Sequence, residues 1–330
     1  MNEKNKKILL ISNMYPSKKY PHYGVFIKNI FDILKQNNFN LDKVVLKKHD
    51  SKLMKLIAYL YFYFKIIFKI LFNNYAIIYG HYASHISFPL LIALKFKHNL
   101  NIVLNVHGND IVPEDNNDLK FIPHVRKLLI LCNKIIAPSV YFKNILIDEY
   151  GIDSNRILVF PSGGIDTKVF HKIENKDYIY KKYNFDKSKK HIGFVSRLEE
   201  KKGWDIFLKS AKEILTQNNN IEFIVVGDGS QKTDYLQLKQ NLGLSDEIRE
   251  FQLLPQNEIC EIFNILDIFC FPTYRKSESL GLVGLESMAC GTIVIGSDNY
   301  GPGSYIQNDF NGFTFKTGDE AKSDRSHVVL

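Results

Sequence analysis

The stretch ESLGLVGLESMACG, residues 278–291, decides the fold. Its apolar part begins after Gly281 and predicts a helix, whose first N–H groups, from Leu282 and Val283, have no partner within the helix and can bind an anion. The flanking segments 267–272 (DIFCFP) and 292–297 (TIVIGS) are typical of buried strands. A strand, loop, helix and strand with such a turn is where an open α/β sheet binds ligands. The alternative is a capped helix with two solvated acids, Glu278 and Glu286.

Length and composition predict a folded protein of two domains. The chain has 330 residues, 45% of them hydrophobic and 24% charged, which excludes wholesale disorder. The four cysteines stand in apolar contexts without paired spacing. They therefore indicate reduced, buried residues of a cytosolic protein, and neither a zinc site nor a disulfide set.

The positive charge lies in the first half of the chain. Residues 1–160 hold 22 Lys and Arg against 11 Asp and Glu, whereas residues 161–330 hold 21 against 24. This asymmetry favours a partner such as nucleic acid, an anionic membrane or an acidic substrate, because a general compositional bias should load both halves alike. The first apolar run, residues 8–11, is too short for a secretory signal, so we expect a cytoplasmic protein.

The first half predicts an α/β domain over residues 1–162. Strands are expected at 7–12, 75–79, 101–106, 134–137 and 156–160, and helices at 25–36 and 86–95. Gly24 precedes the first of these helices, where backbone can approach a phosphate, although no G-x-G-x-x-G pattern is present. His107 follows a strand in the sequence HGND, at the place where α/β sheets present reactive groups. A purely structural histidine is the alternative.

Residues 51–72 (SKLMKLIAYLYFYFKIIFKILF) form the most apolar region of the chain. Lysines interrupt it, so no uncharged run reaches the roughly 20 residues that a membrane span needs. At helical spacing Lys52, Lys55, Lys65 and Lys69 fall on one arc and apolar residues cover the rest. The stretch predicts a basic amphipathic helix. This helix either lies in the interface of an anionic membrane or is a core helix whose lysines line its solvent-exposed edge.

A glycine-rich break and a polar segment, residues 163–190, predict a linker between the domains. A second α/β domain is expected over 191–330, with strands at 191–196, 221–226, 248–254, 268–271 and 292–296. Arg197 and Lys202 follow its first strand, and a guanidinium fork beside a point charge suits diphosphate oxygens. The alternative is a solvated turn that Glu199 and Glu200 neutralise.

Several motifs taken together resemble the retaining GT-B glycosyltransferases of family 4. They are MYPSKKYPHYGVFIKN, HGND, SRLEEKKGWDIFL, VVGDG, FPTYRKSESLGLVGLESMACGTIVIGSD and NGFTF, and the spacing from Glu278 to Glu286 matches the E-x7-E motif of that family. The resemblance implies an α/β fold of the GT-B type, with two Rossmann-like domains facing a central cleft.

The resemblance also implies a role for each site residue. Arg197 and Lys202 would neutralise the diphosphate of a nucleotide-sugar, with the N–H groups of Leu282 and Val283 completing the phosphate site. Glu286 would accept hydrogen bonds from the ribose, and Glu278 would lie beside the transferred sugar. From the other domain, Gly24 would approach the phosphates and His107 the sugar hydroxyls, with Asp110 as a neighbour.

The implied activity is a retaining hexosyltransferase reaction that needs neither metal nor cofactor, because the cations and helix N–H groups stabilise the leaving diphosphate. The expected donor is a UDP-sugar. The expected acceptor is a glycan or a lipid-linked glycan in surface polysaccharide biosynthesis of the capsule, O-antigen or LPS type. The enzyme would sit peripherally on the inner face of the membrane, bound through residues 51–72. Nucleic acid is not an expected partner, since the lysines follow an apolar helix and not a groove-reading motif.

The chain departs from the family at its end. The family continues past the NGFTF strand with further helices, the last crossing back onto the first domain, whereas this chain closes in the polar sequence TGDEAKSDRSHVVL. We therefore expect the C-terminal helices to be missing. Two alternatives to an active transferase stay open, namely a truncated, inactive GT-B homologue that binds nucleotide or a partner, and a nucleotide-sugar epimerase of the same fold.

Overall fold

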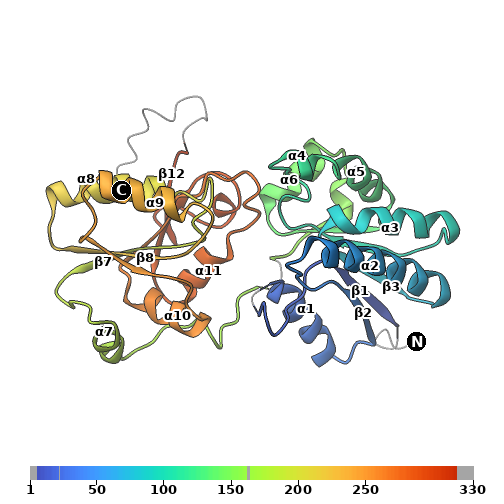
Figure 1. The fold of residues 1–330 in the computed structure, drawn as a ribbon, viewed down its shortest axis with the longest axis horizontal. Helices are drawn as coiled ribbons and strands as arrows, with labels where there is room; N and C mark the ends of the chain where they lie inside the picture. The colour runs from blue at the N-terminus through green and yellow to red at the C-terminus, as the bar shows by residue number, and fades with distance from the viewer. Residues whose placement is uncertain (1–5, 22, 162–163, 318–330) are drawn as a thin grey trace. The chain divides into compact units, whose positions relative to one another are not determined.

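The computed structural model describes residues 6–21, 23–161 and 164–317, so the polar end of the chain from residue 318 lies outside the described residues. The chain divides into two compact units, residues 1–163 and 164–330. Each unit is built on one six-stranded sheet in which all the paired strands run parallel (Figure 1). This confirms the α/β prediction of two Rossmann-like folds.

The sheet of the first unit has the strand order β2-β1-β3-β4-β5-β6. Its strands are β1 (Ile8–Ser12), β2 (Leu41–Val45), β3 (Ile77–His81), β4 (Ile102–Asn105), β5 (Lys134–Ala137) and β6 (Ile157–Val159). Its helices are α1 (Val25–Gln36), α2 (Lys52–Phe72), α3 (Ala83–Phe96), α4 (Asn116–Leu119), α5 (Ile122–Leu131) and α6 (Val140–Asp148). The chain turns back across the sheet between β1 and β3, which is where such folds bind ligands.

The sheet of the second unit has the order β12-β11-β10-β7-β8-β9. Its strands are β7 (Lys190–Val195), β8 (Ile221–Val226), β9 (Ile248–Phe251), β10 (Ile268–Phe271), β11 (Ile293–Ser297) and β12 (Gly312–Phe315). Its helices are α7 (Asp177–Tyr183), α8 (Trp204–Gln217), α9 (Lys232–Asn241), α10 (Gln256–Ile265) and α11 (Leu282–Ala289). Here the switch point lies between β7 and β10, whose following loops share one edge of the sheet.

The segment predicted as a linker contributes to the second unit. It contains α7, and its side chains Phe170, Ile179 and Phe185 are buried in the same core cluster as Phe263. These apolar residues are spaced among lysines and asparagines, so the composition of residues 163–190 conceals their burial. The described part of this segment, from Gly164, is thus packed protein.

Helix α2 presents an apolar face to solvent. Only Phe62, Ile66 and Ile70 are buried on it, packed under α3. The outer side holds nine large hydrophobic residues between 48% and 72% exposed, which we call the apolar foot: Leu53, Met54, Leu56, Ile57, Leu60, Tyr61, Phe64, Phe68 and Phe72. Lys52 and Lys55 are exposed, as expected, but Lys69 turns inward and pairs with Asp42 at 2.5 Å. Lys69 is thus occupied by an ion pair within the first unit, with its side chain 25% exposed.

None of the described helices combines the length and the apolar character that a membrane span requires. The helix prediction for residues 51–72 is confirmed, with Ser51 accepting a hydrogen bond from the Met54 N–H at the helix start.

Candidate functional site

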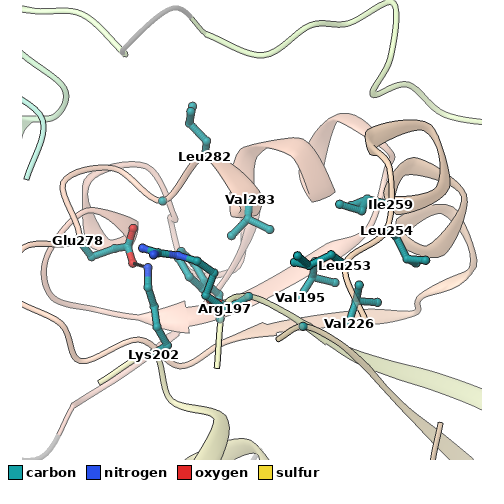
Figure 2. A pocket seen from close by; sticks show the side chains of 14 residues that line it. Val195, Arg197, Lys202, Val226, Leu253, Leu254, Ile259, Glu278, Leu282 and Val283 are labelled. Carbon is teal, nitrogen blue, oxygen red and sulfur yellow. Dashed lines mark hydrogen bonds and ion pairs between the residues drawn. The ribbon is translucent and has the colours of Figure 1, made fainter. Parts of the chain in front are cut away.

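A pocket of about 300 Å³ opens at the switch point of the second sheet (Figure 2). It is lined by the ends of three strands and the loops after four, by Ile259 of α10 and by the start of α11. The lining residues are Val195, Ser196, Arg197, Lys202, Val226, Gly227, Leu253, Leu254, Ile259, Phe271, Glu278, Gly281, Leu282 and Val283. The pocket thus brings together five of the residues singled out in the sequence, namely Arg197, Lys202, Glu278, Leu282 and Val283.

Two loops are tied together to form the floor of the site. The Lys201 carbonyl oxygen accepts hydrogen bonds from the Tyr274 N–H at 3.0 Å and from the Thr273 hydroxyl at 3.2 Å. Gly203, which has φ +84°, starts α8 so close to β10 that a Cβ there would lie 2.0 Å from the Pro272 carbonyl oxygen. The backbone on both sides of Lys202 is therefore fixed against the loop that follows β10.

Lys202 and Glu278 form an ion pair inside the pocket. The Lys202 Nζ lies 2.5 Å from Glu278 Oε2, and the two side chains are only 12% and 13% exposed. The loop that carries the carboxylate is held by its own backbone, because the Glu278 N–H donates to the Arg275 carbonyl oxygen and the Glu278 carbonyl oxygen accepts from the Gly301 N–H, both at 2.9 Å. Figure 2 shows the amine pointing at the carboxylate, with the Arg197 guanidinium beside them.

Glu199 holds two guanidinium groups at the rim of the site. One carboxylate oxygen lies 2.6 Å from Arg197 Nη1, and the other lies 3.2 Å from Arg275 Nη1. Arg275 also donates from Nε to the Ser277 hydroxyl at 3.1 Å. The alternative, a turn neutralised by its acids, thus applies to Glu199 and Arg197, yet the Arg197 side chain stays 60% exposed and can turn to a ligand.

Helix α11 directs its N-terminus into the pocket. Gly281 has φ +78°, and a Cβ there would lie 2.4 Å from the ring of Phe271, so only glycine permits this turn. The Gly281 carbonyl oxygen accepts from the Tyr305 hydroxyl at 2.9 Å, and no side chain caps the helix. The N–H groups of Leu282 and Val283, the first two residues of the helix, have no intrahelical acceptor and carry the positive end of the helix dipole.

Glu286 lies one turn further along α11 and is not among the residues that line the pocket. Positions three and four residues apart share one side of a helix, so Glu286 lies on the side that carries Leu282 and Val283. Burial raises the pKa of its carboxyl group to about 7. Glu286 therefore changes charge near neutral pH.

The other end of the pocket is apolar and was not predicted from the sequence. Figure 2 shows Leu253, Leu254, Ile259 and Val226 gathered away from the charged groups. Leu253 and Leu254 stand in the loop after β9, so the rule that ligands bind beyond the carboxyl ends of strands could have indicated them. The sequence emphasised charged residues and passed over these side chains.

In the first unit, Gly24 stands before α1, where a Cβ would lie 2.8 Å from the backbone carbon of Met14. The loop after β1 and the start of the helix are thus in backbone contact. Asp110 is 1% exposed and fixes the HGND loop through its side chain. Its Oδ1 accepts hydrogen bonds from the N–H groups of His107 at 3.0 Å and Gly108 at 2.8 Å. Its Oδ2 accepts a hydrogen bond from the Ala83 N–H at 2.9 Å. Burial raises its pKa, against these three hydrogen bonds.

His107 lies in a set of rings at the carboxyl end of β4. Its ring is 4.9 Å from that of Phe26, 5.7 Å from that of Tyr82 and 5.4 Å from that of His81, measured between centroids. Burial lowers the pKa of His107 to about 3. The side chain is therefore uncharged at neutral pH and can exchange hydrogen bonds but does not act as a cation.

The second-unit pocket combines two cations, a helix N-terminus and an apolar end. The first three groups converge on one anion-sized space, and the apolar end can cover an organic ring. Within the described ranges, no cluster of three or more His, Cys, Asp or Glu side chains could hold a metal ion. The site is thus suited to a phosphorylated organic ligand.

Two family models match successive parts of the chain. The model described as Glycosyltransferase Family 4 matches residues 29–169, and the model described as Glycosyl transferases group 1 matches residues 175–326. The D-inositol 3-phosphate glycosyltransferase of Rhodococcus jostii is 27% identical over 187 residues, which are 54% of this chain and 40% of that protein. The 2-deoxystreptamine glucosyltransferase of Streptomyces kanamyceticus is 34% identical over 103 residues, 31% of this chain and 26% of that protein. The matched segments thus span less than half of these relatives.

Solved structures share the fold over nearly the whole chain. HepE of Anabaena, solved with UDP and glucose, has a TM-score of 0.71 at 18% identity, covering 96% of this chain and 87% of that one. Sucrose-phosphate synthase of Thermosynechococcus elongatus has a TM-score of 0.76 at 14% identity, with 96% and 87% covered. These structures share the fold, and the two family models, which together match residues 29–169 and 175–326, show that the chain belongs to the GT-B glycosyltransferases of family 4.

Proposed function

We propose that this chain transfers a sugar, with retention of anomeric configuration, from a UDP-sugar to a hydroxyl of a glycan or lipid-linked acceptor. The observation that carries the proposal is the divided pocket of the second unit, charged at one end and apolar at the other (Figure 2). A nucleoside diphosphate has the same division. Its phosphates fit the end with Arg197, Lys202 and the α11 N-terminus, and its base fits the end with Leu253 and Leu254.

The chemistry of the donor assigns a role to each charged group. When the bond between the anomeric carbon and the phosphate oxygen breaks, negative charge grows on the diphosphate. Fixed cations and N–H groups already aimed at that charge lower the barrier. Lys202 and Arg197 supply the cations, and the N–H groups of Leu282 and Val283 supply the helix end. In this scheme the neutralisation comes from the protein, so we expect turnover in the presence of EDTA.

In this proposal Glu278 and His107 contact the transferred sugar. Glu278, held by Lys202, accepts hydrogen bonds from sugar hydroxyls and offers negative charge near the anomeric carbon, which becomes positive. The acceptor oxygen forms its bond to that carbon on the face that the phosphate leaves, and the acceptor proton passes to the departing phosphate oxygen. His107 bonds a sugar hydroxyl as a neutral ring, Asp110 fixes the loop that carries it, and Gly24 lets backbone approach the phosphates.

Incubation with a panel of nucleotide-sugars tests the proposal against its alternatives. With a membrane extract as acceptor source, a transferase consumes one donor and incorporates its labelled sugar. An epimerase converts the donor alone, without any acceptor. An inactive homologue binds UDP and turns over nothing. Conversion without acceptor, or binding without turnover across the whole panel, would overturn the transfer reaction.

We expect donor affinity to rise with pH around neutrality, because Glu286 must be a carboxylate to accept two ribose hydroxyl groups. Its pKa of about 7 leaves it mostly protonated at pH 6. UDP-glucose, a diphosphate diester, has no group that titrates in this range. The dissociation constant should therefore tighten by about tenfold between pH 6 and pH 8. Calorimetric titration measures this change.

The matched control for this pH dependence is Glu286→Gln, which keeps the volume and removes the charge. Its affinity for UDP-glucose should be weak and nearly independent of pH. A wild-type dissociation constant that is flat from pH 6 to pH 8, or a Glu286→Gln protein with the wild-type slope, would contradict the assignment of Glu286 to the ribose.

We further propose that the apolar foot of α2 lies in the interface of an anionic membrane, which brings the enzyme to a lipid-linked acceptor. Phe64, Phe68 and Phe72 form a continuous row, with ring centroids 5.9 Å and 4.7 Å apart along it. Lys52 and Lys55 in the first turn of the helix and Lys47 and Lys48 before it are exposed. Aromatic rings at headgroup depth with lysines nearby match an anionic bilayer surface.

Replacing the three rings together, Phe64→Ser, Phe68→Ser and Phe72→Ser, should lower sedimentation with vesicles of anionic lipid by at least about tenfold in partition coefficient. These side chains are exposed, so the fold should persist. Leu236→Ser with Phe310→Ser, two exposed apolar residues of the second unit, is the matched control and should sediment as wild type. Vesicle binding that changes neither with the content of anionic lipid nor with the salt concentration would refute the membrane role.

A further inference from the structure

Three buried polar residues form a row across the centre of the first sheet. Ser12 of β1, His81 of β3 and Asn105 of β4 are partners in register on adjacent strands, and each is 0% exposed. They occupy the carboxyl ends of the strands at the switch point between β1 and β3. A polar row inside a parallel sheet costs free energy unless its groups are hydrogen-bonded, so their partners matter.

His81 contacts the histidine to which the transfer reaction assigns the sugar. Its Nδ1 lies 3.1 Å from His107 Nε2, and the two rings are stacked with 22° between their planes. His81 Nε2 is buried and has no hydrogen-bond partner among the residues that the structure describes. The contact therefore uses one nitrogen of each ring and leaves Nδ1 of His107 for other partners.

A hydrogen bond between two neutral imidazoles can form in two ways. If His107 donated from Nε2, His81 would carry its proton on Nε2, where an N–H group would be buried without an acceptor. If His81 donates from Nδ1, its Nε2 carries no proton, so the atom buried without a partner is an acceptor and not an N–H group. Unpaired buried N–H groups are rarer in proteins than unpaired acceptors, so the second arrangement is favoured.

We propose that His81 is a positioning residue that holds His107 in the tautomer with its proton on Nδ1, so that His107 offers a neutral hydrogen-bond donor to the substrate. This role rests on the proposed transferase function, whereas the tautomer itself does not. Tyr82, stacked on His107 with 14° between the ring planes, fixes the ring from another side.

The neutrality of the pair suits the reaction. Burial lowers the pKa of both histidines, and the neighbouring His107 lowers that of His81 further. A charged imidazolium beside the sugar would oppose the positive charge that develops at the anomeric carbon, whereas a neutral N–H can bond a hydroxyl without that cost. His81 thus supplies orientation, with no proton transferred to or from it.

Nitrogen NMR of the ¹⁵N-histidine-labelled full chain tests the tautomer directly, because protonated and unprotonated ring nitrogens differ widely in chemical shift. We expect His107 to show a protonated Nδ1 and a bare Nε2, with its signals among those of the 10 histidines identified by their loss in His107→Gln. In His81→Leu the fixed tautomer should give way to a mixture. In His81→Asn, whose amide N–H can replace Nδ1–H, it should be retained.

Kinetics provide the second readout. His81→Leu should lower kcat by about tenfold or more with KM for the donor nearly unchanged, and His81→Asn should restore much of the loss. His85→Leu is the matched control, since the His85 ring packs between those of Tyr59 and Phe121 and not against His107.

A wild-type His107 with its proton on Nε2, or an unchanged tautomer in His81→Leu, would overturn the proposal. If His81→Leu does not fold, the wild-type spectrum alone decides the tautomer. A protein with the expected spectrum but no donor turnover would refute the transferase function and leave the positioning of His107 intact.

Discussion

Replacement of Lys202 by alanine is expected to lower kcat/KM for the donor by about 10²–10³-fold, the usual effect of removing one preorganised group that stabilises developing negative charge. The side chain is 12% exposed, so water replaces the lost ammonium group poorly. The change also leaves the Glu278 carboxylate unpaired at the place where the diphosphate must bind. Initial rates over a range of donor concentrations measure the effect.

Two further variants make the Lys202 result specific. Lys212→Ala removes an exposed lysine from the neighbouring helix α8 and should leave the rate unchanged. Lys202→Arg keeps the charge but replaces a point charge with a wider planar fork, so it should recover only part of the activity. If Lys202→Ala retained kcat/KM within about threefold of wild type, the pocket would not be the phosphate site.

Substitution of Gly281 by alanine is expected to reduce the free energy of unfolding of the second unit by about 2–4 kcal/mol and to abolish donor binding. The backbone there has φ +78°, and the added methyl group would lie 2.4 Å from the ring of Phe271, the last residue of β10, which is 1% exposed. Relief of this clash must displace either β10 or the start of α11. The N–H groups of Leu282 and Val283 would then no longer point at the phosphates.

Gly243→Ala separates the cost of the positive φ from the cost of the clash with Phe271. Gly243 belongs to the same unit and has φ +67°, but its nearest neighbour is the flexible Lys212 Nζ at 3.8 Å. That change should cost only about 1 kcal/mol, from the backbone conformation alone. Urea unfolding monitored through Trp204 reports on the second unit. Equal losses in the two variants would show that the contact with Phe271 contributes nothing.

The central strands were predicted well because they are buried on both faces. The segment ILLIS of β1 has no exposed residue, and such continuous apolar runs identify a strand of a parallel sheet without knowledge of its neighbours. Strand β2, with the sequence LDKVV, was not predicted, since it lies at the sheet edge and only Val44 is buried. Edge strands carry mixed sequences, so their pattern is weak.

The exposure of α2 could not be predicted from its sequence. The helix is apolar on nearly all sides, and periodicity gives direction only when one side is polar. Which residues face the core depends on α3 and on the ion pair between Lys69 and Asp42, which are 27 residues apart in the chain. A local sequence pattern does not predict long-range pairs of this kind.

The charged residues of the site were found in the sequence because cations after a strand and glycine before a helix are local signals. The geometry of these residues could not be predicted from the sequence. The pairing of Lys202 with Glu278 joins positions 76 residues apart and depends on hydrogen bonds from Tyr274 and Thr273 to Lys201. The apolar residues Leu253 and Leu254 were missed because an apolar side chain alone does not distinguish a pocket wall from a core, although their place after a strand was a usable signal.

Both cations of the site are paired, Lys202 with Glu278 and Arg197 with Glu199. A buried cation without a partner is costly, so Glu278 stabilises the Lys202 ammonium group, whose side chain is only 12% exposed. When a diphosphate binds, it competes for the same groups. Donor binding should weaken as salt is added, since salt screens the attraction between the diphosphate and the cations of the site.

The central claim is that the second-unit pocket binds the diphosphate of a nucleotide-sugar, and calorimetric titration of UDP into the protein in EDTA tests it most directly. We predict saturable binding at one site per chain that UDP-glucose displaces and that Lys202→Ala removes. Absence of saturable binding by UDP and by the other nucleoside diphosphates, or wild-type affinity in Lys202→Ala, would contradict the account.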